Sequence, residues 1–102
     1  MQYLVLATTS EKIKYEEMPS LVHDEVRRVW ELYKSGVIRS INHRGDVRGV
    51  VFMLEADKKE DVEKAMESLP LVKAGLAVIN NVIPLKPYLS YERLFREEFK
   101  GQ

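Results

Sequence analysis

The sequence predicts an α+β fold in which two helices cover one face of a four-stranded antiparallel sheet. Three observations carry this prediction: four apolar segments read as strands, helical spacing in the two segments between them, and a short link between the middle two strands. The order is therefore strand, helix, strand, strand, helix, strand. Two strand-helix-strand units joined by a hairpin form the split βαβ, or ferredoxin-like, arrangement, and right-handed crossovers place both helices on the same face.

The first strand and helix are predicted at residues 3–8 and 20–34. Apolar side chains recur at helical spacing in the second segment, and we expect them to form one stripe packed in the core: Val22, Val26, Val29, Trp30 and Tyr33. Ser20 suits the N-cap position of this helix. Gly36 suits the left-handed residue that follows a helix end.

The second half begins with a hairpin of residues 37–44 and 49–56, joined through the turn signal Gly45-Asp46. Asp57 and Glu60 form a variant of the capping box, so the second helix is expected over 57–69, where Pro70 ends it. The last strand is expected over 77–85, and the pair Asn80-Asn81 within it indicates a bulge or an exposed register.

Composition narrows the classes of function. The chain of 102 residues suits one domain, and its 16 basic and 16 acidic residues give no net charge to attract nucleic acid or an anionic membrane. The absence of cysteine excludes disulfides, thiolate metal sites and a cysteine nucleophile, and is expected of a cytoplasmic protein. No apolar segment approaches the roughly 20 residues of a membrane span. His23 and His43 lie on different elements without ligand spacing, so neither a metal nor another cofactor is expected.

Self-association is expected because the strands are apolar on both faces. In the first strand, Leu4 and Leu6 alternate with Val5 and Ala7, whereas a sheet with one solvated face would alternate with polar residues. The economical cover for the second face is the sheet of another copy, which gives a dimeric barrel or a higher homo-oligomer. The alternative is a monomer whose C-terminal helix folds over its own sheet. Residues 1–88 would form the barrel domain, and 89–102 a C-terminal amphipathic helix or tail that straps subunits together or covers the barrel.

Two family resemblances follow from particular segments. The order of elements, the junction 70–76 and the segment 83–88 resemble the YCII-related proteins, which belong to the dimeric α+β barrel superfamily. Residues 24–39, 51–52 and 69–71 are similar to muconolactone isomerases of the same superfamily. YCII-related proteins have an aspartate before the proline that ends the second helix, where this chain has Leu69. Their suspected acid/base pair therefore does not carry over. The isomerase resemblance places an acidic residue at Glu25 and a basic residue at Arg39. It implies a proton shift on a lactone acid, with a carboxylate base and a cation that holds the substrate carboxylate.

The candidate catalytic residues are Glu25, Arg39, His43 and Glu55. Arg39 and His43 lie four residues apart on a strand and would share one face, as a cation and a base in one pocket or as solvated charges at a strand end. Glu55 would be a buried carboxylate with a raised pKa or a solvated strand-end residue. Glu25 would be a catalytic carboxylate, or an acidic residue that the helix dipole favours near the start of the helix.

The sequence thus predicts a subunit that binds a small organic molecule between sheet and helices. Two functions remain open: a muconolactone-isomerase-like enzyme that shifts a proton on a small organic acid, and a non-catalytic ligand-sensing or interaction subunit.

Overall fold

The computed structural model describes residues 1–96, and its element order agrees with the predicted one. The elements are β1 (Gln2–Thr9), α1 (Pro19–Lys34), β2 (Ile38–His43), β3 (Gly49–Glu55), α2 (Lys59–Glu67), α3 (Pro70–Lys73), β4 (Ala77–Leu85) and the 3₁₀ helix η1 (Leu89–Phe95).

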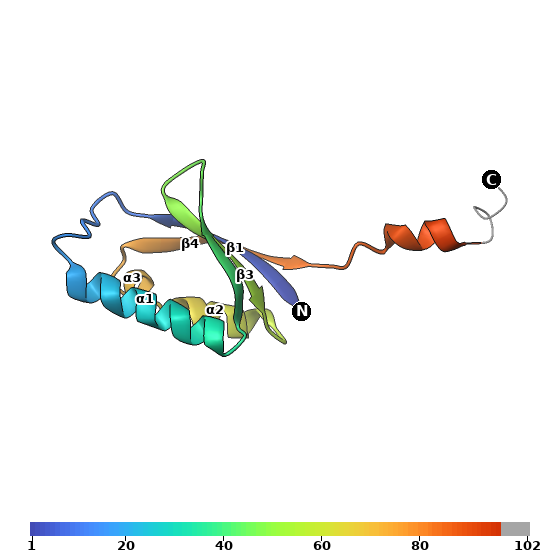
Figure 1. Cartoon of the computed structure of the whole chain (residues 1–102), viewed down its shortest axis with the longest axis horizontal. Coiled ribbons are helices and arrows are strands. Elements are labelled where there is room, and N and C mark those ends of the chain that lie inside the picture. Colours follow the sequence, from blue (N-terminus) through green and yellow to red (C-terminus); the bar gives the residue numbers. More distant parts are fainter. Residues whose placement is uncertain (97–102) are drawn as a thin grey trace.

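The four strands form one antiparallel sheet in the order β2-β3-β1-β4. The helices α1, α2 and α3 lie together on one side of this sheet (Figure 1). We call the helix-covered side the inner face and the opposite side the outer face. The predicted α+β, ferredoxin-like class is therefore confirmed.

The core lies between the inner face and the helices. The inner-face side chains Tyr3, Val5 and Leu54 are buried, and Leu32 of α1 and Val62 of α2 pack against them. On β1 these residues alternate with Leu4 and Leu6, which stay partly exposed on the outer face. The double-sided apolarity of the strands thus leaves one face covered within the chain and one face without cover among the described residues.

The helix ends differ from the predicted ones. The α1 helix begins at Pro19 with Met18 as its N-cap, because the fixed φ of proline suits the first helical position, so Ser20 does not cap it. The α2 helix begins at Lys59 without a side-chain cap and ends at Glu67, so the expected capping box does not form. Pro70 does not itself end that helix; it begins the separate turn α3.

The left-handed conformation predicted for Gly36 is confirmed. Gly36 has a φ of 85° directly after α1, as expected for a residue that reverses the chain after a helix.

The aromatic residues of α1 were wrongly expected in the core. Trp30 and Tyr33 are 57% and 50% exposed, and Val26 is 62% exposed. The two rings stack on one another, with centroids 5.6 Å apart. The residues of α1 that pack toward the sheet include Val29 and Leu32. The apolar stripe of the helix is therefore wider than the surface that the sheet covers.

Two strands contain an extra residue. In β4, Asn81 pairs with Leu6 and Ile79 pairs with Ala7, so Asn80 is the bulge that the asparagine pair indicated. A similar irregularity in β2 lies between Ile38 and Ser40, and Arg39 occupies it. This second bulge was not predicted, and it changes which residues of β2 share a face.

After β4 the chain leaves the body of the molecule. Figure 1 shows residues 86–96 projecting as an arm beyond the sheet, which contributes to a longest dimension of 66 Å. The helical part, Leu89–Phe95, is a 3₁₀ helix within the segment where an amphipathic helix or tail was predicted. The arm's large side chains are all exposed: Tyr88, Leu89, Tyr91, Leu94 and Phe95. The remainder of the predicted C-terminal helix lies outside the described residues. No helix in residues 1–96 is long and apolar enough to cross a membrane.

A glycine at the start of β3 gives the first testable prediction. A Cβ at Gly49 would overlap the carbonyl oxygen of Ala7 on the neighbouring strand, whereas a Cβ at Gly45 in the hairpin loop would meet no atom within 4 Å. We expect Gly49→Ala to lower the free energy of unfolding by about 1–3 kcal/mol, because backbones of two paired strands must separate. We expect Gly45→Ala to change it by less than about 0.5 kcal/mol. Urea denaturation of both variants measures the difference, and equal stabilities would contradict the close approach.

Candidate functional site

A cavity of about 240 Å³ lies between α1, the inner face of the sheet and the α2–α3 segment. Its walls are mostly apolar, and five of its lining residues carry polar side-chain atoms: Thr9, Tyr15, Glu25, His43 and Arg48. A mostly apolar pocket with a few convergent polar groups is the usual form of a small-molecule site.

Glu25 contributes a carboxylate to this cavity from the second turn of α1. Its Oε1 accepts a hydrogen bond of 2.9 Å from the backbone N–H of Leu71 at the start of α3. Burial raises the pKa of the Glu25 carboxyl above its usual value, and the hydrogen bond from Leu71 opposes this rise only in part. A carboxyl with a raised pKa is suited to exchange protons nearer neutral pH than an ordinary glutamate.

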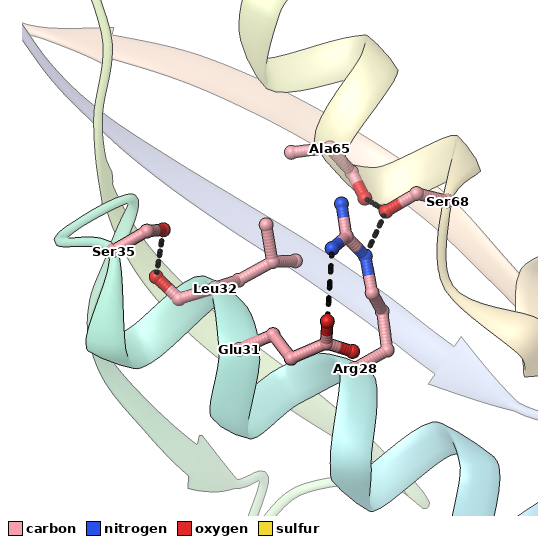
Figure 2. Close-up of polar contacts among 6 residues, drawn as sticks. All are labelled: Arg28, Glu31, Leu32, Ser35, Ala65 and Ser68. Atoms are coloured by element: carbon pink, nitrogen blue, oxygen red, sulfur yellow. Dashed lines mark hydrogen bonds and ion pairs between the residues drawn. The ribbon is translucent and has the colours of Figure 1, made fainter.

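A polar contact between α1 and α2 fixes the helix that carries Glu25. Arg28, less than one turn further along α1, donates from Nε to Ser68 Oγ at 2.9 Å, and Ser68 Oγ donates to the carbonyl oxygen of Ala65 at 2.6 Å. Figure 2 shows these bonds, with Arg28 also 3.9 Å from the Glu31 carboxylate. The end of α2 is thereby joined to α1 directly before the segment that contains Leu71.

His43 contributes an imidazole from the opposite wall. It lies at the end of β2 and is paired with Val50 of β3, while Ile41 is paired with Phe52. All four of these residues line the cavity. His43 is also exposed to solvent. The cavity thus brings a carboxylate from the helix layer and an imidazole from the sheet layer to one space.

Arg39 and Glu55 lie outside this cavity. The bulge takes Arg39 out of the alternation with Ile41 and His43, and its Nε donates to the carbonyl oxygen of Gly36 at 2.8 Å. Glu55 forms an ion pair of 2.7 Å with the amino group of Met1, which lowers the pKa of the Glu55 carboxyl. Of the two interpretations left open for Glu55, the structure agrees with a strand-end residue and not with a buried carboxylate of raised pKa.

Three polar residues of the cavity, Thr9, Tyr15 and Arg48, were absent from the sequence-based candidates. Thr9 lies at the end of β1. Tyr15 lies in the loop before α1, and Arg48 lies in the β2–β3 loop directly before Gly49. Loops have no periodicity from which the direction of a side chain can be predicted, and the two residues are 33 positions apart. His23 is exposed on α1 and does not line the cavity. Residues 1–96 contain no group of three or more histidine, aspartate or glutamate side chains that could hold a metal ion.

The raised pKa of Glu25 gives a prediction about stability. The unfolded chain ionises this carboxyl at its ordinary pKa, whereas the folded chain resists ionisation because the group is half-buried. The stability that Glu25 contributes is therefore fully present below the unfolded pKa and declines as the pH rises through the folded pKa. Glutamine does not ionise and still offers an oxygen to the Leu71 N–H. We expect the stability of Glu25→Gln relative to the native chain to increase between about pH 4 and about pH 7.

The matched variant Glu25→Ala removes the acceptor as well as the charge. The Leu71 N–H would lose its partner, so we expect this variant to be about 1–3 kcal/mol less stable than Glu25→Gln. Chemical denaturation at the two pH values measures both differences. A stability difference between Glu25→Gln and the native chain that stays constant with pH would show that Glu25 is not desolvated by the fold.

Comparisons with known proteins place this geometry in a structural context. No protein-family model and no curated protein sequence matches the chain. Among solved structures, it is similar to 5-chloro-2-hydroxyhydroquinone dehydrochlorinase from Burkholderia phenoliruptrix AC1100, in a complex with 2,5-dihydroxybenzoquinone. The TM-score is 0.66 at 18% sequence identity, and the match covers 84% of this chain and 94% of the enzyme. The chain therefore shares its ferredoxin-like fold with this enzyme.

Proposed function

We propose that this protein is a small-molecule enzyme that moves a proton on a small organic acid bound in the cavity. The observation that supports this proposal best is Glu25, a half-buried carboxyl with a raised pKa in a mostly apolar cavity. Structural ion pairs also perturb pKa values, but here the cause is burial beside an open cavity and not a neighbouring charge.

In the proposed reaction, the ionised Glu25 removes a proton from a carbon of the bound acid. Its carboxylate is held in place by the Leu71 N–H, so one oxygen has a fixed direction and the other remains for the substrate. His43 lines the same cavity from the sheet and would return a proton to a second position, or donate a hydrogen bond to the oxygen on which charge develops. A proton shift of this kind needs no further reactant.

The size and lining of the cavity favour a ligand with one ring. An apolar cavity of about 150 Å³ accommodates benzene, and the cavity here is about 240 Å³ with room for polar substituents. The structurally similar dehydrochlorinase has a one-ring compound, 2,5-dihydroxybenzoquinone, in its complex. The two structures share a fold, and the neighbour's one-ring compound supports a ligand of similar size for this cavity.

We also propose that the protein assembles with copies of itself through the outer face of the sheet. Leu4 and Leu6 of β1 lie beside Met53 and Val51 of β3 on this face, and Ile83 of β4 extends the same apolar surface. Contiguous apolar surface of this kind is usually covered in an assembly. The exposed aromatic and leucine side chains of the C-terminal arm would add contacts to a neighbouring copy.

The proposed reaction is tested with muconolactone and related small lactone acids in D₂O. We expect the native protein to exchange a carbon-bound proton or isomerise the compound, as followed by ¹H NMR. Glu25→Gln should slow this reaction by about 100- to 10,000-fold, the range of a lost general base. The rate should also rise with pH as Glu25 ionises, with a midpoint above that of an ordinary glutamate.

The control for this experiment is Asp24→Asn. Asp24 is the neighbouring carboxyl on α1, is exposed and does not line the cavity, so its loss should leave the rate within about twofold. Equal rates for the two variants would contradict the role of Glu25. Tight binding of the acids by the native protein without any proton exchange would favour the alternative, a non-catalytic ligand-sensing subunit.

Assembly is tested with a charge on the outer face. We expect Met53→Lys to raise the dissociation constant of the oligomer by at least about tenfold, because a buried unpaired charge is costly. Val47→Lys places the same charge in the exposed β2–β3 loop and should leave assembly unchanged. Light scattering gives the mass, and circular dichroism confirms that both variants are folded. A native protein that is monomeric at micromolar concentration would overturn the proposed assembly.

A further inference from the structure

Arg48 is held in place at the cavity by two contacts with the loop before α1. Its Nη2 donates a hydrogen bond of 3.0 Å to the carbonyl oxygen of Ile13, which is buried. Its Cζ lies 5.6 Å from the centroid of the Tyr15 ring, a cation–π distance. Arg48 also lines the cavity, together with Tyr15. Contacts within the chain therefore hold the guanidinium of Arg48, an exposed residue, at the cavity wall.

The charge of Arg48 has no carboxylate partner within residues 1–96. The other two arginines near the β2–β3 hairpin have different surroundings: Arg44 forms an ion pair of 2.7 Å with Asp46, and Arg39 bonds the Gly36 carbonyl outside the cavity. A guanidinium carries five N–H donors, and the Ile13 carbonyl accepts from one of them. A fixed planar cation with unused donors is suited to bind a carboxylate through two parallel hydrogen bonds.

We propose that Arg48, positioned by Tyr15 and Ile13, is the anion subsite of this cavity and binds the carboxylate of a one-ring organic acid. The ring would occupy the apolar part of the cavity, whose lining includes Val22, Val29, Ile41, Phe52 and Leu69. The inference rests on the proposed function, since it names the cation that a proton shift on an acid requires. It also assigns the substrate-holding role to Arg48 in place of Arg39.

The competing role for Arg48 is purely structural. The same contacts with Ile13 and Tyr15 would tie the loop before α1 to the β2–β3 loop, with no ligand involved. A structural tie would affect charged and neutral ligands of the same shape alike, because it acts through the form of the cavity. An anion subsite would affect only the charged ligand.

The experiment therefore uses benzoate and its neutral analogue benzamide as probes. Their dissociation constants for the full chain are measured by NMR titration, and their ratio, benzamide over benzoate, reports the preference for a carboxylate. We expect the native protein to prefer benzoate by about 10- to 100-fold, the range of charge-assisted hydrogen bonds. Arg48→Met should bring this ratio to about 1, and Arg48→Lys should keep part of it, because a lysine retains the charge and loses the planar fork.

The matched controls are Arg39→Met and Arg44→Met, which remove the same charge from positions outside the cavity wall. Both should keep the native ratio. The inference is overturned if the native protein shows no preference for benzoate, if Arg48→Met leaves the ratio unchanged, or if either control lowers it equally. Should Arg48→Met be too unstable to titrate, the ratio for Arg48→Lys decides: an undiminished preference would contradict the subsite. Proton exchange plays no part in these measurements, so a failure of the proposed chemistry is distinguished from a failure of the subsite.

Discussion

The hydrogen bond between the Glu25 carboxylate and the Leu71 N–H is the contact through which the fold and the proposed site constrain one another. It joins α1 to α3, two elements that are 46 residues apart at this point. The same carboxylate lines the cavity, where burial disfavours its charge. The fold therefore needs an acceptor at this position, but not an ionisable one. A glutamine at position 25 would accept the Leu71 N–H equally well and would carry no charge into the cavity wall. The presence of a glutamate is therefore explained better by function than by stability.

Local physical rules were enough to predict the architecture. The short apolar segments and the helical spacing between them predicted the element order, and Gly36 marked the end of a helix. The pair Asn80-Asn81 indicated a bulge or an exposed register, and the bulge lies at Asn80. The rules were less successful where a choice depended on the neighbouring layer. Trp30 belongs to the apolar stripe of α1 by sequence, yet the sheet covers only the side that carries Leu32. The width of a covered surface is a property of the packed layers and is not encoded in the period of one helix.

The candidate site could be predicted only in part, because some of its residues are placed by contacts that exist only in the folded chain. Glu25 was a candidate because of the isomerase resemblance and His43 because of its place on a strand, and both line one cavity in the structure. Arg39 was grouped with His43 by a strict two-residue alternation, which a single bulge in β2 interrupts. Glu55 pairs with the amino group of a residue 54 positions away, a contact that no local pattern contains. Arg48 was missed because a loop residue gains its direction only from the contacts it makes after folding.

The two faces of the sheet separate the proposed chemistry from the proposed assembly. The cavity lies on the inner face, beneath the helices, whereas Leu6 and Met53 belong to the outer face. Successive side chains of a strand point to opposite faces, so a substitution on one face leaves the side chains of the other in register. β1 illustrates the division, since Ala7 lines the cavity while its neighbour Leu6 lies on the surface available to a second copy. An oligomer built on the outer face would hold the sheet rigid from behind, which is the support that a site with fixed partners such as Arg48 and Glu25 requires.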